Sequence, residues 1–391
     1  MSINRSMKGK TLLNWIELSE KALAKNIAGL SRLAGGRKIA ASVKANAYGH
    51  GLEPMVQMLG RHREVEYLTV HSVQEAQHCR EYGWDRRIML LGPAPFDSLE
   101  AIIEHDLEPM IFTKEALRRL GTISNKTKTA VRTHLKLETG THRQGVPEQE
   151  LESYAQIYKK YPYLGKPYGA AMHFANIEDT TSHEYAQEQL NRFNRAVKRM
   201  TALGLKPSIR HTACSAALIL FEKTRFELVR PGISVYGHWP SKETYLSYRL
   251  EGGSNNIFEP VLTWKTRVTQ IKKVPANSFV GYGCTYRTTA PSRLAVLPVG
   301  YSDGYDRGLS NLAYVLIRGR RAPVRGRVCM NLMMVDITNI PGVKLQEPVT
   351  LIGDESSESL SAEQLAAWAG SINYEILARL SGHLERHVVS S

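Results

Sequence analysis

Residues 42–51 read SVKANAYGHG, with a lysine at position 44. The mostly apolar run before it, residues 39–43, is typical of a buried strand, and the small and glycine residues after it are typical of a turn. Lys44 is therefore predicted to stand where a rigid strand opens into a loop. Burial there lowers the pKa of an amine and makes it a nucleophile toward an aldehyde. Most lysines at the end of a strand simply point into solvent, so the surrounding sequence has to show whether Lys44 is a reactive residue.

Strand-like runs alternate with amphipathic helical stretches around this segment. The runs lie near residues 38–44, 66–71, 87–92, 108–113, 130–138, 167–174, 208–214 and 227–236. Eight strands that alternate with helices predict a closed (β/α)8 barrel of the TIM type, and hence the α/β fold class. We expect residues 18–250 to form this barrel.

The pattern changes after residue 250. Glycine, serine and asparagine at residues 251–256 predict a flexible linker, and short strand-like runs with polar turns follow it. A chain of 391 residues is long enough for two domains. We therefore expect residues 251–391, together with an N-terminal strand at residues 10–17, to form a mostly β C-terminal domain.

Composition limits the function classes. With 42% hydrophobic and 23% charged residues, the chain is typical of a globular protein. It has no run of eighteen apolar residues, so no membrane partner is expected, and its first residues lack the apolar core of a secretory signal. We therefore expect a cytoplasmic protein. The four cysteines are scattered and form no CxxC pair, so neither a disulfide scaffold nor a metal site is expected.

The formal net charge is +14. The densest basic patch is formed by Arg318, Arg320, Arg321, Arg325 and Arg327. It falls in a stretch that alternates like paired strands, so a solvated sheet face is expected. Aromatic residues are not interleaved with it as a single-strand stacking platform requires, so we expect no nucleic-acid partner.

Polar residues follow several of the predicted strands. They are Lys44, Lys136, Glu138, Arg143, His173, Ser215 and Arg230, with Gly232 and Ile233 close behind. The carboxyl ends of barrel strands meet at one rim, where the chemistry of such folds lies, and phosphate commonly binds after the last two strands. The sequence therefore predicts a site at this rim.

These motifs resemble those of the alanine racemase family, the barrel-fold class of pyridoxal-phosphate enzymes. SVKANAYGHG is similar to the family's lysine motif, and VRPGISVYG, PVLTWKTRV, VGYGCTY, LPVGYSDGY, GRVCMN and INYE match its later motifs in order. The resemblance runs from Trp15 to about Val389. It implies interconversion of L- and D-alanine, which supplies D-alanine for peptidoglycan.

The resemblance also implies the cofactor pyridoxal 5'-phosphate, bound covalently by Lys44. The residues implied to bind its phosphate are Tyr48, Ser215, Gly232, Ile233 and Tyr374. Hydroxyls and free N–H groups suit a phosphate dianion. Arg230 would face the pyridine nitrogen and, as a permanent cation, keep it unprotonated. Arg143 would contact the cofactor's phenolic oxygen and the substrate carboxylate.

Racemisation needs a base on each face of the substrate carbon. Lys44 would serve one face, and the resemblance assigns the other to Tyr282 of the partner subunit. A phenol with an ordinary pKa of about 10 is a poor base at neutral pH and needs positive charge nearby. The resemblance places His173 and Arg230 in a hydrogen-bonded chain behind it, although a lone histidine such as His173 is more often a core residue.

Three more residues complete the implied site. Lys136 matches a lysine that is often carbamylated in the family, which would make it anionic and orient Arg143. Tyr301 and Met330 of the partner subunit would narrow the entrance and receive the substrate carboxylate. Each active site would then be shared, so a homodimer would be required for activity.

The sequence departs from the family pattern at several positions. Cys214 stands where asparagine is common, Asn331 stands where aspartate is usual, and residues 139–145, TGTHRQG, are bulkier than usual. Loss of a carboxylate near the entrance leaves open a racemase of broader specificity, acting on serine, lysine or arginine.

Two alternatives of other kinds fit the sequence less well. A decarboxylase of the same architecture is disfavoured because its glycine-rich phosphate loop is absent from the sequence. A non-catalytic pyridoxal-phosphate-binding regulator would need only the barrel, and the second domain with Tyr282 argues against it.

Overall fold

The computed structural model describes residues 12–254 and 257–390 of the chain. These residues form two compact units. We call them the barrel unit, residues 21–48, 52–254 and 257–260, and the β unit, residues 12–20, 49–51 and 261–390. No helix among the described residues is long and apolar enough to cross a membrane.

The barrel unit contains an eight-stranded parallel sheet in the order β8-β7-β6-β5-β4-β3-β2-β9. Its strands are β2 (Lys38–Ser42), β3 (Val65–Val70), β4 (Arg87–Leu90), β5 (Leu107–Ile111), β6 (His134–Lys136), β7 (Gly169–Ala171), β8 (Ile209–His211) and β9 (Leu228–Val229). The segments that carry the two end strands also meet, because the amide of Arg230 donates to the carbonyl of Ala213 at 2.8 Å. The predicted (β/α)8 barrel is confirmed.

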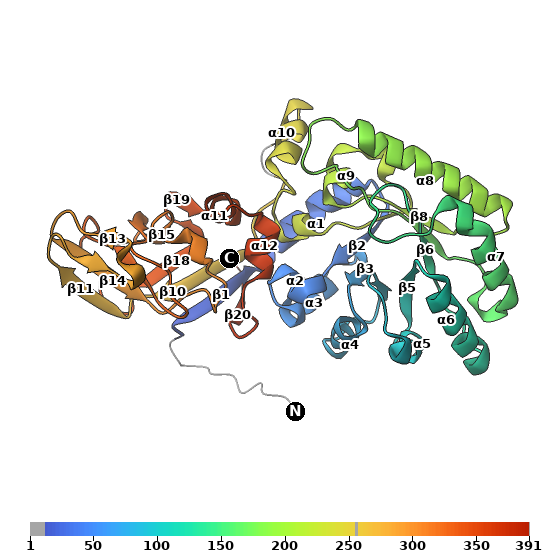
Figure 1. Cartoon of the computed structure of the whole chain (residues 1–391), viewed down its shortest axis with the longest axis horizontal. Coiled ribbons are helices and arrows are strands. Elements are labelled where there is room, and N and C mark those ends of the chain that lie inside the picture. Colours follow the sequence, from blue (N-terminus) through green and yellow to red (C-terminus); the bar gives the residue numbers. More distant parts are fainter. Residues whose placement is uncertain (1–11, 255–256, 391) are drawn as a thin grey trace. The chain divides into compact units, whose positions relative to one another are not determined.

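Helices surround these strands (Figure 1). They are α1 (Glu20–Ala34), α3 (Leu52–Gly60), α4 (Val73–Glu81), α5 (Glu100–Glu104), α6 (Lys114–Thr127), α7 (Leu151–Lys160), α8 (Glu184–Ala202), α9 (Ser215–Leu220) and α10 (Lys242–Leu250). In α8 the apolar residues Leu190, Phe193 and Ala196 recur at helical spacing and are buried. Helix α4 begins at a capping box formed by Ser72 and Glu75.

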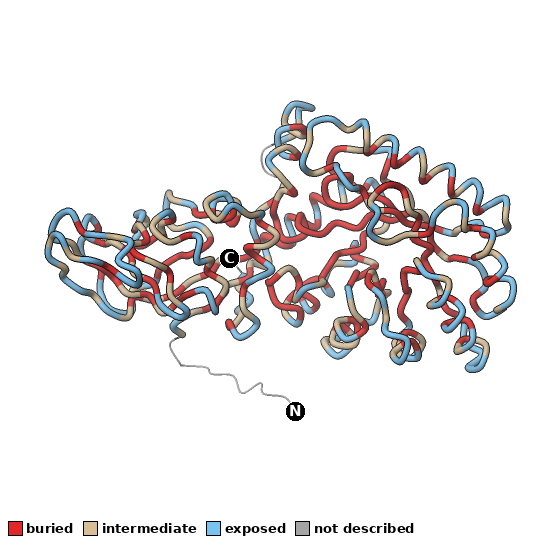
Figure 2. Tube along the Cα trace, in the orientation of Figure 1, coloured by how far each residue is buried: buried red, intermediate tan, exposed pale blue. Residues whose placement is uncertain are grey.

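Alternation along the strands places the site residues. One core cluster takes an apolar residue from each of seven strands: Ala40, Tyr67, Met89, Met110, Ala171, Ile209 and Leu228. Residues two apart on a strand share a face, so His173 and Arg230 continue the inward faces of Ala171 and Leu228. Figure 2 shows the barrel strands as largely buried. The polar residues thus lie directly above an apolar core.

Four predicted strands are much shorter in the structure than expected. The runs at residues 130–138, 167–174, 208–214 and 227–236 contain only β6, β7, β8 and β9. Residues beyond these strands leave the sheet to form the rim, and Ile233–Tyr236 become the 3-10 turn η5. Residues 233–236 have the apolar pattern of a strand because their side chains are buried, as those of an inner strand would be.

The β unit is built of short strands. One sheet has the order β16-β15-β18-β10-β1-β20, a second has the order β11-β14-β17, and β12 pairs with β13. Its elements are β1 (Asn14–Ser19), β10 (Leu262–Arg267), β11 (Gln270–Val274), β12 (Phe279–Val280), β13 (Tyr286–Arg287), β14 (Ser292–Leu297), β15 (Tyr314–Ile317), β16 (Arg320–Pro323), β17 (Met333–Asp336), β18 (Pro348–Glu355), β19 (Glu358–Leu360), α11 (Ala362–Ala369), α12 (Asn373–Ala378) and β20 (Glu385–Val389). The N-terminal strand begins at Asn14 and continues to Ser19 rather than ending at residue 17, because β10 and β20 pair with it on both sides. Residues 10 and 11 of the predicted strand lie outside the described ones.

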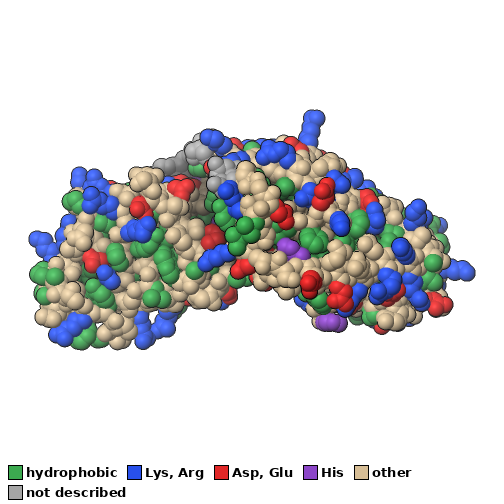
Figure 3. All heavy atoms as spheres, turned by 90° about the horizontal axis from the view of Figure 1, so that it is seen from above, with side chains coloured by type: hydrophobic (Ala, Val, Ile, Leu, Met, Phe, Trp, Pro, Cys, Tyr) green, Lys and Arg blue, Asp and Glu red, His purple; other side chains and the backbone are tan. Residues whose placement is uncertain are grey.

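The arginine-rich stretch lies on the β15–β16 hairpin and the segment after it. Arg321 pairs with Glu358 at 2.7 Å, and Arg325 lies 3.7 Å from a carboxylate oxygen of Asp336. These pairs are what a solvated sheet face is expected to form. On both units the basic side chains are scattered among acidic and apolar ones over the face drawn in Figure 3.

Candidate active site

Lys44 follows β2 directly and opens the turn that the sequence predicted. Residues Ala45 to Tyr48 form a left-handed turn with φ between 52 and 55°, a conformation that costs about 1–2 kcal/mol per residue for side chains other than glycine. Hydrogen bonds hold it: the amide of Ala45 donates to Glu75 at 2.7 Å, and the amide of Leu52 donates to Asn46 at 2.8 Å. The turn thus keeps Lys44 at the barrel rim.

Glu75 is a supporting residue that the sequence analysis missed. Its carboxylate accepts hydrogen bonds from the amides of Ala45, His71 and Ser72. The capping-box spacing from Ser72 to Glu75 could have identified it as a helix cap, but its bond to Ala45 joins segments 30 residues apart. Glu75 therefore links the start of α4 to the turn that carries Lys44.

The phosphate-binding residues expected in the barrel unit lie together. The Ser215 hydroxyl, at the start of α9, accepts hydrogen bonds from the amides of Gly232 at 2.9 Å and Ser234 at 3.4 Å. A Cβ placed on Gly232 would lie 2.5 Å from the Tyr48 hydroxyl, so only glycine allows this approach. Burial raises the pKa of Tyr48 to about 12, which keeps its hydroxyl protonated as a donor. This glycine cradle, with its hydroxyls and amides, fits a phosphate group.

Cationic side chains gather at the same rim. Burial lowers the pKa of Lys44, and the charge of Arg143 lowers it further, while Glu75 and Glu178 oppose the shift. Burial and the charges of Arg143 and Arg230 lower the pKa of Lys136 to about 8. The rim therefore holds more positive charge than its carboxylates neutralise, and it favours anionic groups.

His173 lies among these cations. Burial, followed by the charges of Arg230, Arg143, Lys136 and Lys44, lowers its pKa to about 3. The imidazole is therefore neutral at physiological pH. The structure thus brings together all the residues that the sequence placed at the barrel rim.

The loop that carries Arg143 has its own support. The carboxylate of Glu138 accepts hydrogen bonds from the amides of Gly140 at 2.6 Å and His142 at 3.1 Å. The Lys136 amine donates to the amide oxygen of Gln144 at 3.3 Å. Arg143 is exposed between these two anchors. Its side chain is thus available at the rim, while its backbone is fixed.

Arg230 is buried and held by neighbouring strands. It donates to the carbonyls of His211 at 2.6 Å and Met172 at 2.7 Å, and it also contacts the His211 ring nitrogen Nδ1. The resemblance placed His173 in a hydrogen-bonded chain with Arg230; among the described residues the bonded histidine is His211 instead. Burial lowers the Arg230 pKa to about 10, so the guanidinium stays charged.

A buried chain extends from this histidine into the barrel. His211 Nε2 lies 2.8 Å from His134 Nδ1, and His134 Nε2 lies 2.9 Å from Glu108 Oε2. A guanidinium can only donate, so His211 Nδ1 accepts, its Nε2–H donates to His134, and His134 donates to Glu108. Burial and the charge of Arg230 hold the pKa of His211 well below its ordinary value, so it stays neutral.

Glu108 ends this chain. Burial opposes its ionisation, but the hydrogen bond from His134 and the charges of Arg87 and Arg132 lower its pKa. Arg132 donates to it at 2.8 Å, and Arg87 lies at 3.2 Å. The sequence analysis missed His211, His134 and Glu108 because they stand within strands and are joined across 26 and 77 residues of sequence.

The remaining predicted residues belong to the β unit. Tyr282, Tyr301 and Met330 expose 74%, 43% and 56% of their surfaces. Tyr301 and Met330 lie side by side, because the amides of Tyr301 and Ser302 donate to the carbonyls of Cys329 and Met330, both at 3.0 Å. Tyr374 lies in α12.

Asn331, the residue that departs from the family pattern, lies next to this pair. Its side-chain amide donates to the Ser302 hydroxyl at 2.8 Å. A neutral amide thus takes a position at the surface beside Tyr301 and Met330.

Comparison with known proteins agrees with these features. Residues 18–240 match the family model for the alanine racemase N-terminal domain, and residues 261–388 match that for the C-terminal domain. The alanine racemase of Leptospira interrogans serovar Lai is 36% identical over 388 residues, covering 98% of this chain and 97% of the relative. The alanine racemase of Halothermothrix orenii is 36% identical over 374 residues, covering 95% of this chain and 96% of the relative.

Solved structures give the same result. The alanine racemase of D-cycloserine-producing Streptomyces lavendulae is 28% identical, with a TM-score of 0.90 and 98% of each chain covered. That of Bacillus anthracis with bound L-Ala-P is 29% identical, with a TM-score of 0.87 and coverage of 97% of this chain and 96% of that one. The chain therefore belongs to the alanine racemase family.

Proposed function

We propose that this protein interconverts L-alanine and D-alanine with pyridoxal 5'-phosphate, using Lys44 and Tyr282 of the partner subunit as the two bases. The observation that carries the proposal is the cationic rim beside a glycine cradle. The charge of Arg143 lowers the pKa of Lys44 and of Lys136. The pKa of His173 is lowered by all four cations of the rim, which are Lys44, Lys136, Arg143 and Arg230. Such a rim suits a phosphorylated cofactor together with a substrate carboxylate.

The barrel residues would hold the cofactor at defined points. Tyr48, Ser215 and the amides of Gly232 and Ile233 would bind its phosphate, with Tyr374 as a further hydroxyl. Arg230 would face the pyridine nitrogen, and the chain through His211 would keep the guanidinium in place. Bound pyridoxal phosphate supplies an electron-withdrawing ring that acidifies the substrate's Cα–H bond.

The two bases would act on opposite faces of the substrate carbon. The lowered pKa of Lys44 favours its neutral amine, which can remove a proton from one face through Nζ. Tyr282 of the partner subunit would return a proton to the other face through its hydroxyl. Arg143 would bind the substrate carboxylate and restrict rotation of the substrate between the two bases. D-alanine formed in this way would supply peptidoglycan synthesis in the cytoplasm.

The exposed surface of the β unit supports a homodimer. The β unit exposes several large apolar or aromatic side chains. They are Tyr282, Tyr301 and Met330, and also Phe279, Leu312 and Leu332. Large apolar side chains left in solvent favour a partner surface that covers them. A second copy of this chain would bury them and present Tyr282 to the other subunit's Lys44, so each site would be shared.

The direct test is racemisation by the purified holoenzyme. We expect L-alanine to be converted to a D/L mixture, measured by chiral chromatography, while L-serine, L-lysine and L-arginine react far more slowly. Bound cofactor without turnover of any of them would overturn the proposed function and favour the regulator.

A racemase of broader specificity is the second candidate, and Asn331 favours it. Its neutral amide bonds to Ser302 beside Tyr301 and Met330, where the family pattern has a carboxylate. Faster turnover of serine, lysine or arginine than of alanine in the same assay would select this candidate. The Asn331→Asp variant would then be expected to shift preference back toward alanine.

Replacement of Gly232 by alanine is expected to weaken cofactor binding at least tenfold, or about 1.4 kcal/mol. The added Cβ would lie 2.5 Å from the Tyr48 hydroxyl and displace it from the cradle. The affinity is measured by titrating apoenzyme with pyridoxal phosphate and following its absorbance. Gly60→Ala is the control, since a Cβ there meets no atom within 4 Å. Equal affinities for both variants would contradict the cradle.

Lys136 is expected to be carbamylated. With a pKa of about 8, a tenth or so of its amines are neutral at pH 7 and about half at pH 8. The neutral nitrogen adds to CO2, forms an N–C bond and releases one proton, and the resulting anion is stabilised by Arg143 and Arg230 nearby. Enzyme equilibrated with 13C-bicarbonate should show a carbamate carbon signal in NMR. The signal should be absent from Lys136→Arg, and its absence from the unchanged protein would refute the modification.

A further inference from the structure

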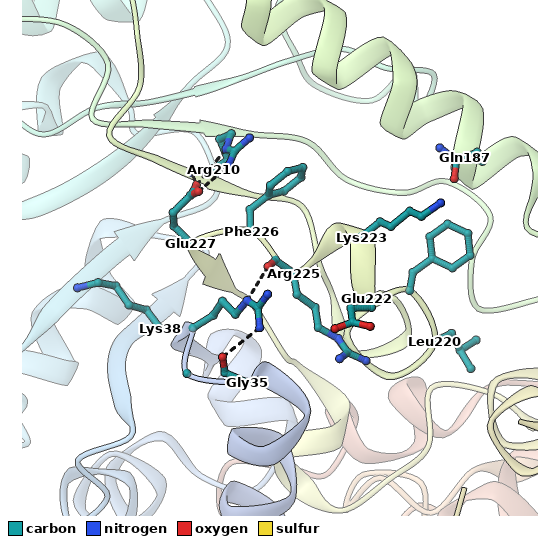
Figure 4. Close-up of a pocket in the computed structure, with 13 residues that line it drawn as sticks. Gly35, Lys38, Gln187, Arg210, Leu220, Glu222, Lys223, Arg225, Phe226 and Glu227 are labelled. Carbon is teal, nitrogen blue, oxygen red and sulfur yellow. Dashed lines mark hydrogen bonds and ion pairs between the residues drawn. The ribbon is translucent and has the colours of Figure 1, made fainter. Parts of the chain in front are cut away.

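A cavity of about 1020 Å³ lies at the other end of the barrel from Lys44. It is lined by the residues that lead into β2, by Arg210 of β8 and by residues 220–227, which precede β9, so it adjoins the amino ends of these strands (Figure 4). Helix α9 has only six residues, against fifteen in α1 and nineteen in α8. The short helix leaves part of the outer layer open at this place.

The lining of this cavity is mainly cationic. Its charged side chains are Arg37, Lys38, Arg210, Lys223, Arg225, Glu222 and Glu227. Arg210 is neutralised by Glu227 at 2.6 Å, and Lys38 by Glu66 at 2.6 Å. Within the described part of the chain, Arg37, Lys223 and Arg225 form no ion pair with a carboxylate. These three positive charges therefore outnumber the one remaining carboxylate of the lining, that of Glu222, which acts on Arg225 without forming an ion pair in the described part of the chain.

Backbone carbonyls hold the two arginines in place. Arg37 Nε donates to the carbonyl of Arg225 at 3.0 Å, and its Nη1 donates to the carbonyl of Gly35 at 3.0 Å. Arg225 Nε donates to the carbonyl of Leu218 at 2.9 Å. These bonds fix both guanidiniums without neutralising them. Arg37 Nη2 and Arg225 Nη1 make no hydrogen bond within the described residues and remain accessible.

Three effects act on the charge of Arg225. Burial lowers its pKa, the carboxylate of Glu222 raises it, and the charge of Arg37 lowers it by less than Glu222 raises it. An anion with several oxygens accepts hydrogen bonds from planar guanidinium forks, which is the geometry that these groups offer to phosphate. The preorganised pair thus favours a phosphoryl group.

The remaining lining indicates the body of the ligand. Phe221 and Phe226 are partly exposed beside the cations. The volume of the cavity lies at the upper end of the range typical of small-molecule sites, roughly 300–1,000 Å³. We propose that this cavity is a second binding site, for a phosphomonoester that carries an aromatic or similarly flat apolar group. Arg37, Arg225 and Lys223 bind the phosphoryl group, and the two phenylalanines contact the apolar group.

Calorimetric titration of the holoenzyme with phenyl phosphate, at constant ionic strength, tests the proposal. In the holoenzyme the cofactor occupies its own phosphate site, so binding there does not contribute. We expect one saturable site per chain, and weaker binding of inorganic phosphate because it lacks the ring. No saturable binding, or inorganic phosphate binding as tightly as phenyl phosphate, would overturn the proposed ligand class.

Two variants locate the site. Lys223→Gln removes an exposed amine with no partner in the described structure, and it should weaken phenyl phosphate binding about five- to tenfold. Arg225→Lys keeps the charge but loses the planar fork, and it should weaken binding by a similar factor. Lys206→Gln, an exposed lysine outside the cavity, is the matched control. Unchanged affinity in both cavity variants would refute the site, and alanine racemisation by each variant verifies that its fold is intact.

Discussion

Mixing inactive Lys44→Ala chains with inactive Tyr282→Phe chains is expected to restore racemisation to about a quarter of the unchanged protein's activity. Each variant alone lacks one of the two proposed bases in both sites, so its activity should fall by at least about a thousandfold. In a mixed dimer, one site loses both bases and the other keeps an intact Lys44 and an intact tyrosine from its partner. About half of randomly mixed dimers are of this kind, and each has one working site of two.

The controls separate sharing from simple loss. Lys44→Ala chains alone must stay inactive. A chain that carries both substitutions must also stay inactive when it is mixed with either single variant, because no site then has both bases. Size-exclusion chromatography with light scattering verifies that the variants still form dimers. Inactive mixed dimers would contradict the shared site, whereas an active Tyr282→Phe variant by itself would contradict the role of the tyrosine.

Replacement of Glu108 by alanine is expected to lower the free energy of unfolding by about 3–5 kcal/mol. The carboxylate is buried, accepts the hydrogen bond of His134 and neutralises Arg87 and Arg132. Its removal leaves the buried imidazole of His134 without its acceptor and leaves Arg87 without a carboxylate, while Arg132 keeps its ion pair with Asp106. Urea denaturation measures the change. Glu66→Ala is the control, because its ion pair with Lys38 is partly exposed and is expected to be worth about 0–1 kcal/mol.

The same chain predicts how stability depends on pH. His211 and His134, and also His173 at the rim, have lowered pKa values in the folded protein, so below a pH of about 6.5 the unfolded chain binds protons that the folded chain does not. Stability should therefore decline as pH falls below this value. Glu108, with its lowered pKa, adds a further loss at pH values below about 4.3. A His211→Phe variant should show a shallower first decline, and an unchanged pH dependence of its denaturation midpoint would contradict the share assigned to His211.

The β-unit part of the site could be predicted only from resemblance. Tyr282, Tyr301 and Met330 stand on turns and at strand ends, with no periodicity that marks them. Their exposure on the β unit is a property of the folded chain that composition does not reveal. The exposed apolar residues around them are consistent with the expectation of a partner subunit, which the mixed-dimer experiment tests.

The sequence by itself determined the barrel, because the alternation of apolar runs and amphipathic helices is a local pattern that each segment carries alone. It also placed Lys44, Lys136, His173, Ser215 and Arg230 at strand ends, since strand ends are readable from the turns that follow them. Only the tertiary structure decided that Arg230 bonds His211 rather than His173, and that Glu108 ends the buried chain. Those contacts join strands distant in sequence, and their geometry depends on how the sheet closes. The left-handed turn after Lys44 was also decided by the tertiary structure. Alanine and tyrosine disfavour positive φ, and hydrogen bonds that the amides of Ala45 and Leu52 donate to the side chains of Glu75 and Asn46 stabilise the turn.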